Sequence, residues 1–199
     1  MNVLFFGDIH GNTSYAKEIA KKADSADLLV CTGDLSTAGE GFGEVLKIIA
    51  QSNKTILLIP GNNETPEFVE TGSDEYDNVI PIHGEVYEDK HIRFLGIGGG
   101  TVSPFNTVFE ISDEQFNNLL SKDYGKIDVL VSHTPPKETT LDETKTKLHV
   151  GSFPIGKWIE KNKPKYCACG HIHENAGKEI KIGKTICFNP GPLGRIIKI

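Results

Sequence analysis

Short polar motifs follow five predicted strands of this 199-residue chain. They are Asp8-Ile9-His10, Gly33-Asp34, Gly61-Asn62-Asn63-Glu64, His133 and Gly170-His171-Ile172-His173. Because the carboxyl ends of parallel strands meet at one edge of an open α/β sheet, we expect these side chains to converge there. Taken singly, each motif is also typical of a surface turn, a helix cap or a hydrogen-bonded histidine. Their occurrence in order, always after a strand, is what indicates a functional site.

The residue types in these motifs indicate metal chemistry. Aspartate, histidine and asparagine without a thiolate suit borderline divalent metals such as Mn, Fe, Zn or Ni better than calcium. Glycines beside four of the sites allow sharp turns that bring a ligand close. The candidate ligands are too many for one ion and suit two if Asp34 bridges them: Asp8, His10, Asp34, Asn62, His133, His171 and His173. Two cations would also supply the positive charge that an arginine guanidinium often provides to a bound phosphoryl group, since only Arg93 and Arg195 are arginines.

The elements that must position these residues alternate in the first third of the chain. Short apolar runs predict strands, and apolar side chains at helical spacing predict helices between them. We expect this β-α-β-α-β order to build a parallel sheet with right-handed crossovers. The ranges are Asn2–Phe6, Asn12 or Thr13 to Ala23, Asp27–Cys31, Phe42–Gln51 and Thr55–Ile59.

The rest of the chain predicts hairpins and further buried strands. Turn residues separate short strand candidates in the middle, and Gly98-Gly99-Gly100 predicts a flexible break. The loop from Pro135 to Gly151 is long for a compact domain, which indicates function. No repeat or linker divides the chain, so we expect one domain over residues 1–199. The expected strands are Val79–Ile82, Glu85–Tyr87, His91–Ile97, Ile127–Ser132, Lys165–Cys169, Glu179–Phe188 and Arg195–Ile199, with helices near Ser112–Ser121 and Ile155–Asn162.

Composition narrows the function classes. A net charge of −6 and the absence of a basic block argue against an extensive nucleic-acid surface. No apolar run reaches the roughly 18–20 residues of a membrane span, and the first residues lack a signal peptide's basic front, so we expect a cytoplasmic protein without a membrane partner. The four cysteines are expected to be small buried hydrophobic side chains. A homodimer is expected from base rates only.

The ordered motifs closely resemble the calcineurin-like metallophosphoesterase family, whose pattern is Asp-x-His, Gly-Asp, Gly-Asn-His-Asp/Glu, His and Gly-His-x-His. The match spans residues 8–173, and the short length resembles the small cap-free prokaryotic members. The resemblance implies an α/β fold, a four-layer α/β/β/α sandwich of two mixed sheets flanked by helices. It places the metal site at the carboxyl ends of the strands.

The resemblance also implies a ligand set and a reaction. One metal would take Asp8, His10, Asp34 and His173; the other would take Asp34, Asn62, His133 and His171. We expect two divalent ions, Mn²⁺ first and Fe, Zn or Ni as alternatives. Such ions bind phosphate oxygens and generate a bridging hydroxide for in-line attack. The expected function is a metal-dependent phosphoesterase for small phosphate esters, with phosphodiesters favoured.

One departure from the family pattern concerns the leaving group. The family has histidine in Gly-Asn-His, thought to assist that group, where this chain has Asn63. Asparagine hydrogen-bonds an oxygen but cannot protonate it, so Asn63 is expected to contact substrate without acting as an acid. His149, in the long loop, is the candidate acid, with a solvated loop histidine as the alternative. Asn12 is expected either to touch substrate or to cap the helix that follows it.

Other members of the family and other functions remain as alternatives. Ser/Thr phosphatases carry Gly-Asp-x-x-Asp-Arg-Gly, and the segment from Gly33 to Gly39 lacks that Asp-Arg pair. Repair nucleases carry a capping domain and a basic surface, which this acidic chain lacks. A metal-binding interaction scaffold with little turnover and a nucleotide-binding regulatory protein are the remaining readings. Hydrolysis of a generic phosphodiester would distinguish an enzyme from both the scaffold and the regulatory protein.

Overall fold

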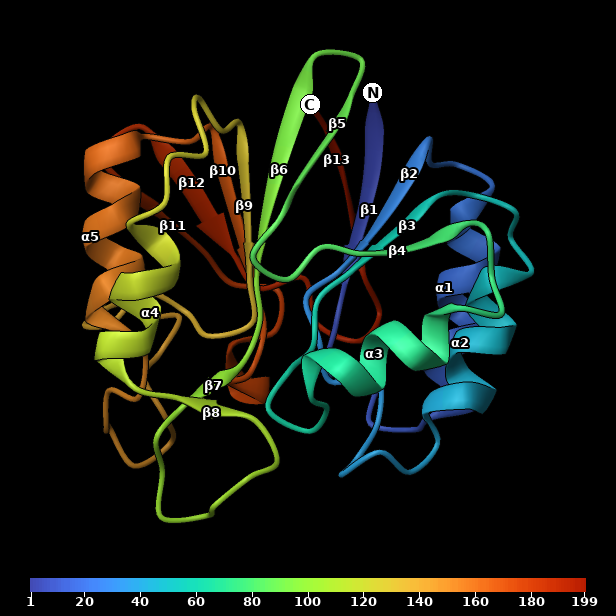
Figure 1. Ribbon diagram of the computed structural model, residues 1–199, viewed down its shortest axis with the longest axis horizontal. Coiled ribbons are helices and arrows are strands. Elements are labelled where there is room, and N and C mark those ends of the chain that lie inside the picture. The colour runs from blue at the N-terminus through green and yellow to red at the C-terminus, as the bar shows by residue number, and fades with distance from the viewer.

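The computed structural model describes residues 1–199, in which two sheets pack face to face and helices cover both outer faces (Figure 1). The first sheet has the order β13-β1-β2-β3-β4, with β1 to β4 parallel and β13 antiparallel to β1. Its strands and associated helices are β1 (Asn2–Phe6), α1 (Thr13–Ala23), β2 (Leu28–Cys31), α2 (Phe42–Ala50), β3 (Ile56–Leu58), α3 (Pro66–Ser73), β4 (Val79–Pro81) and β13 (Arg195–Lys198).

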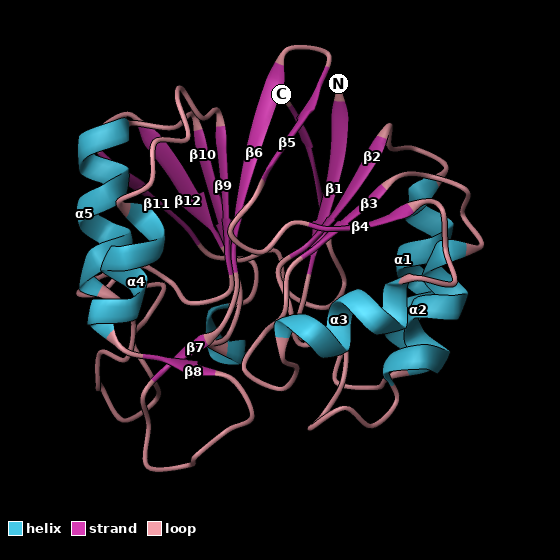
Figure 2. Ribbon diagram, in the orientation of Figure 1, coloured by secondary structure: helices cyan, strands magenta, loops and turns pink.

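The second sheet has the order β11-β12-β10-β9-β6-β5 and mixes parallel and antiparallel pairs. Two very short strands, β7 (Gly100–Thr101) and β8 (Glu110–Ile111), pair with each other below it (Figure 2). The other elements are β5 (Val86–Asp89), β6 (Ile92–Ile97), α4 (Asp113–Leu120), β9 (Val129–Ser132), α5 (Phe153–Asn162), β10 (Tyr166–Cys169), the 3-10 turn His173–Asn175, β11 (Glu179–Ile182) and β12 (Thr185–Phe188).

Strand periodicity explains the layers. Side chains alternate along a strand, so Val3 and Phe5 point into a core shared by both sheets, whereas Leu4 and Phe6 pack with α1 and α2. On the other side, Leu130 and Cys167 pack with α4 and α5. Three apolar cores therefore separate four layers, and the predicted α/β/β/α sandwich is confirmed.

Several local expectations need adjustment. Sequence patterns did not predict α3, whose first turn carries Thr65 as its cap and Pro66 at its start. The three glycines at 98–100 do not form a loose break, because a Cβ at Gly98 would lie 2.5 Å from the Pro60 carbonyl oxygen, and Gly100 belongs to β7. All four cysteines are free and buried, as expected. No helix is both long and apolar enough to span a bilayer.

The carboxyl ends of the parallel strands in both sheets face the same edge of the sandwich. Both chain termini and the β5–β6 hairpin lie at the opposite edge (Figure 1). The loops after β1, β2, β3, β9 and β10, which carry the five polar motifs, therefore meet at the first edge.

Candidate metal centre

The structure brings all seven predicted ligand side chains into one connected cluster between the two sheets. Two groups have donor atoms close enough to hold an ion: Asp8 with His10 and His173, and Asp8 with Asp34 and His133. Asn62 joins the second group through its contacts with two imidazoles. Asp8, Asp34, Asn62 and His133 are buried, whereas His173 is exposed, so one side of the cluster is open to solvent.

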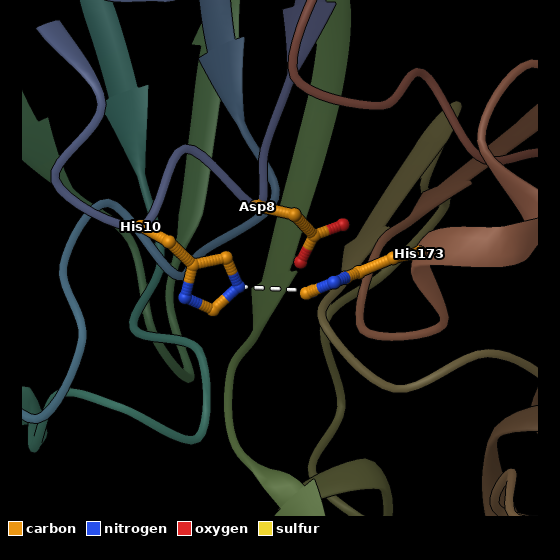
Figure 3. Close-up of side chains that lie close together, drawn as sticks. All are labelled: Asp8, His10 and His173. Atoms are coloured by element: carbon orange, nitrogen blue, oxygen red, sulfur yellow. Dashed lines mark hydrogen bonds between the residues drawn. The ribbon is translucent and has the colours of Figure 1, made fainter.

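The open side consists of Asp8, His10 and His173 (Figure 3). The Nε2 atoms of His10 and His173 lie 2.9 Å apart, although the residues are far apart in sequence. The Asp8 carboxylate lies between them and the buried side, and its Oδ1 accepts a hydrogen bond of 3.0 Å from the His171 backbone N–H. This contact ties the loop after β1 to the loop after β10.

The buried side consists of Asp34, Asn62, His133 and His171. Asn62 Oδ1 lies 3.0 Å from His133 Nε2 and 2.8 Å from His171 Nδ1. Asp34 Oδ2 lies 3.6 Å from the Nε2 atoms of both His10 and His133, so its carboxylate stands between the open and buried sides. This is the position that a bridging ligand requires.

The donor chemistry of the buried side fits a cation. The Thr32 carbonyl oxygen lies 2.8 Å from His133 Nδ1, so that nitrogen must donate its proton to the carbonyl. In the neutral imidazole, Nε2 then presents a lone pair toward Asn62 Oδ1 and Asp34 Oδ2, which are also acceptors. His133 Nε2, Asn62 Oδ1 and Asp34 Oδ2 would repel one another unless a proton or a metal ion lay between them. These residues therefore fit a divalent metal.

The pKa values agree with this picture. Burial alone would lower the pKa of His133, but the Asp34 and Asp8 carboxylates outweigh burial and raise it. Burial would likewise raise the pKa of Asp34, but His133, His10 and hydrogen bonds from Asn63 lower it. For His171, burial and then the neighbouring His133 lower the pKa to about 3, so its imidazole keeps a free lone pair at neutral pH.

The backbone at the ligands is strained. Asp8, His10, Asp34 and His171 have φ angles of 55°, 50°, 54° and 71°. This left-handed region is unfavourable for residues other than glycine and typically costs roughly 1–3 kcal/mol for each residue. Hydrogen bonds from the Asp8 N–H to the Gly33 carbonyl and from the His10 N–H to the Asp34 carbonyl hold two of these turns in place.

Close backbone approach explains the adjacent glycines. A Cβ at Gly61 would lie 1.9 Å from Asp34 Oδ1, and one at Gly33 would lie 2.9 Å from His133 Nδ1. A Cβ at Gly170 would lie 2.9 Å from Asp8 Oδ2. Any side chain at these positions would occupy space that the ligand side chains need.

Asn63 and Glu64 fix the position of Asp34 through hydrogen bonds to its side chain and its backbone N–H. The Asn63 backbone N–H donates to Asp34 Oδ1 over 2.9 Å, and its side-chain amide donates to Oδ2 over 2.8 Å. The buried Glu64 carboxylate accepts from the backbone N–H groups of Asp34 and Gly61 and from both the N–H and the hydroxyl of Ser36. Both residues fix the central carboxylate, and one of the two side-chain N–H groups of Asn63 is engaged there.

Asn12 and His149 lie outside the cluster. The Asn12 side-chain oxygen caps α1 by accepting from the Ser14 and Tyr15 N–H groups, so the capping role expected as one alternative is present. His149 lies in the loop between β9 and α5, and its Nδ1 donates to Asp142 Oδ1 over 2.8 Å. This hydrogen bond is the main cause of a raised His149 pKa.

Sequence reasoning missed three buried polar residues that organise the surrounding loops. Asp142 accepts backbone hydrogen bonds from Glu138, Thr139 and Gly151 in addition to the His149 contact. The Asn175 amide donates to the Leu141 and Glu143 carbonyls, and the Asn189 amide donates to the Ile172 carbonyl. Asn175 and Asn189 bind backbone groups distant in sequence, whereas Asp142 binds groups of its own loop, so only the unusual length of the loop from Pro135 to Gly151 hinted at Asp142.

Comparison with known proteins finds a relative and solved structures of similar fold that cover at least 96% of this chain. The chain is 37% identical over 201 residues to the uncharacterized protein MJ1162 of Methanocaldococcus jannaschii, an alignment that covers 96% of this chain and 88% of that protein. The phosphopantetheinyl hydrolase PptH from Mycobacterium tuberculosis shares the fold, with a TM-score of 0.69, 14% identity and coverage of 98% and 95% of the two chains. A dimetal phosphatase from Danio rerio also shares it, with a TM-score of 0.64, 10% identity and coverage of 97% and 88%.

A family model for calcineurin-like phosphoesterases matches residues 1–175, a span that contains every residue of the metal centre. The ordered motifs, the two mixed sheets and the convergence of their ligand loops agree with this match. The chain belongs to the calcineurin-like phosphoesterase family.

Proposed function

We propose that this metal-dependent phosphoesterase holds two divalent ions and hydrolyses small phosphodiesters. The observation that carries the proposal is the position of the Asp34 carboxylate, which lies 3.6 Å from the Nε2 atoms of both His10 and His133. A central carboxylate with ligands on either side is typical of two-metal sites. The dimetal phosphatase with the same fold supports the count of two ions.

The proposed ligand sets follow this division. Asp8, His10, Asp34 and His173 would hold the ion on the open side, and Asp34, Asn62, His133 and His171 would hold the ion on the buried side. When bound, the ions supply charge that binds phosphate oxygens and lower the pKa of water toward neutrality. The Thr32 carbonyl fixes the His133 ring, and Asn63 fixes Asp34, so both ligands are oriented in advance.

The proposed acid is His149. Its Nδ1 is committed to the buried Asp142 carboxylate, which leaves Nε2 free to give a proton to a leaving oxygen. The loop is tied to the centre, because the Thr101 hydroxyl donates to the Val150 carbonyl over 2.8 Å and Gly100 lies against Asn62 and His171. In this proposal Asn63 positions Asp34 and contacts the phosphate, and the free Asn12 amide contacts an outer part of the substrate.

The proposal also includes the identity of the metal, the location of the protein and its oligomeric state. Imidazole, carboxylate and amide ligands support Mn²⁺ as the first metal to test, with Fe, Zn and Ni next. A cytoplasmic location, one domain over residues 1–199 and a homodimer complete the proposal, and the homodimer rests on base rates alone.

The test is turnover by chelator-stripped protein with added metal. Bis-p-nitrophenyl phosphate and p-nitrophenyl phosphate would be compared with Mn²⁺, Ni²⁺, Zn²⁺ and Mg²⁺, and His171→Ala serves as the variant control. We expect metal-dependent hydrolysis that is faster for the diester and lost in His171→Ala. Tight metal binding without turnover of either ester would reject the enzyme and favour the interaction scaffold.

A further inference from the structure

Residues 101–109, which comprise the last residue of β7 and the loop that leads to β8, form an apolar loop beside the candidate metal centre. Phe105 is 83% exposed, Val102 68% and Val108 50%. Most of the other exposed large apolar side chains also lie at this edge of the sandwich, including Leu148 in the neighbouring loop at 63%. Exposed apolar groups gathered at one edge indicate a binding surface more often than scattered ones do.

Both ends of this apolar loop are fastened to a metal ligand. At its start, a Cβ on Gly100 would lie 2.8 Å from Asn62 Cβ and 3.4 Å from His171 Cε1. At its end, the Phe109 N–H donates to the Asn62 carbonyl over 3.0 Å. The loop therefore projects directly from the buried side of the metal centre, at the bottom of the view in Figure 1.

The apolar loop is also held in one shape. The Glu110 carboxylate accepts from the backbone N–H and hydroxyl of both Ser103 and Thr107, with distances between 2.6 and 3.0 Å. Partial burial would raise the pKa of Glu110, but these bonds lower it to about 2, so the brace stays ionised at neutral pH. Phe105 is thus exposed on a braced loop rather than on a loose one.

The loop offers no charge to a ligand. Residues 101–109 contain no Lys, Arg, Asp or Glu, and the carboxylate of Glu110 is used within the loop. A second polar or anionic group on the substrate would find no ionic partner there. An apolar or aromatic group would gain contact area from Phe105, Val102 and Val108.

We propose that this apolar loop selects phosphodiesters whose retained ester group is apolar or aromatic, with Phe105 as the main specificity-determining residue. This inference rests on the proposed phosphodiesterase function. With the phosphate held at the metals, an ester group that leaves the centre at Asn62 would run along the loop toward Phe105. The second copy of the chain is the competing occupant of the same surface, and the test separates the two.

The test uses two diesters with the same leaving group. Phenyl p-nitrophenyl phosphate and methyl p-nitrophenyl phosphate both release p-nitrophenolate, so only the retained group differs. The ratio of kcat/KM for the phenyl ester to that for the methyl ester is measured in each variant. Because every variant uses the same pair of esters, their intrinsic reactivities cancel when the ratios are compared.

We expect Phe105→Ser to lower this ratio about five- to tenfold, with less than about a twofold change for the methyl ester. Phe105→Tyr keeps the aromatic ring and should keep the wild-type ratio. Ile196→Ser removes an exposed apolar side chain from β13, away from the apolar loop, and should leave the ratio unchanged. Thermal melts and gel filtration of every variant accompany the kinetics.

An unchanged ratio in an active, folded Phe105→Ser protein would overturn the inference and leave the proposed function standing. A fall in molecular mass on Phe105→Ser would also overturn it, because a second copy would then cover the loop. Failure of the wild-type protein to hydrolyse either diester with any metal would overturn the proposed function, and the inference with it.

Discussion

The ligand loops and the rim loops lie at the same edge of the sandwich but differ in how they are held. The ligand loops, which carry the five polar motifs, are mostly buried and joined by backbone hydrogen bonds, and four of their candidate ligands adopt left-handed φ angles. The rim loops, residues 101–109 and 137–151, are more exposed and are braced by single carboxylates, Glu110 and Asp142. Hydrogen bonds order both sets of loops. Only in the ligand loops are the positions of side chains also limited by left-handed φ angles and by close contacts with glycines.

This difference suggests that the ligand loops determine whether the reaction occurs, whereas the rim loops determine which substrates react well. A ligand loop tolerates few residue types, because a glycine contact or a strained turn positions six of the seven candidate ligands, all except His173. A rim loop needs its bracing carboxylate and its end contacts, and in the second loop also the proposed acid His149, so its other residues are free to vary with the substrate. Substitutions in the ligand loops should therefore affect all substrates, and substitutions in the rim loops should affect some substrates more than others.

The largest expected effect is in the ligand loops, at Asp34. Asp34→Asn keeps the shape of the side chain but removes the charge at the centre of the cluster. Loss of a carboxylate that serves both sides should lower kcat/KM roughly a thousandfold or more for every diester. Activity and metal content per chain would be measured together. Full activity with normal metal content would contradict the bridging role.

In the rim loops, the proposed acid should act selectively. His149→Gln should slow diesters with poor leaving groups such as phenol about 100-fold, and p-nitrophenyl esters only a few-fold, because p-nitrophenolate needs no proton. Equal losses for both leaving groups would contradict an acid role.

The pH profile gives a second test of His149. Only protonated His149 can donate, so the rate with a phenol leaving group should fall as pH rises through its pKa. The bond to Asp142 raises that pKa, so Asp142→Asn should move this limb of the pH–rate profile to lower pH. An unmoved limb, with the variant folded, would mean that another group titrates.

A matched pair of glycines tests the close packing of the ligand loops. Gly61→Ala places a methyl group where Asp34 lies and should weaken metal binding about 10–100-fold. Gly43, in α2, has no atom within 4 Å of an added Cβ. Gly43→Ala should leave metal binding unchanged and stabilise the protein by roughly 0.5–1 kcal/mol. Equal metal affinity in both variants, measured by calorimetry, would refute the packing argument.

A last effect concerns stability and not activity, and it involves His83, which accepts the Gly98 N–H over 2.9 Å in the segment before β7. Burial, with a smaller contribution from Lys122, lowers its pKa from 6.5 to about 4. The unfolded chain therefore binds the proton more readily, and stability present above pH 6.5 is lost as pH falls toward 4. Between pH 7.5 and 5 this loss amounts to about 2 kcal/mol. His83→Asn should lose about that much less stability over the same range, as measured by denaturant unfolding, and an identical loss would contradict the assignment.

Sequence patterns predicted the elements that carry continuous apolar runs. The strands around Leu4, Val30, Leu57 and Val131 were expected within about two residues of their observed ends, because buried strands read as unbroken apolar segments. Helix α3 was missed because Phe68 and Val69 are its only large apolar residues. Strands β7 and β8 are two residues long, which is too short for any periodicity.

The candidate site shows the same limit. The clustering of the seven candidate ligands was predicted because their residue types are unusual together and each motif follows a strand. Asp142, Asn175 and Asn189 were not, because a buried polar residue that binds the backbone of irregular loops, within its own loop or far along the chain, has no recognisable sequence pattern. The exposure of Phe105 depends on how Glu110 folds its loop, and composition alone does not give that.

Anomalous diffraction from crystals grown with Mn²⁺ tests whether Asp34 lies between two metal ions. We expect two anomalous peaks, one beside Asp8, His10 and His173 and one beside Asn62, His133 and His171, with Asp34 between them. A single peak on either side, or none in protein that is active with Mn²⁺, would rule out a bridging Asp34.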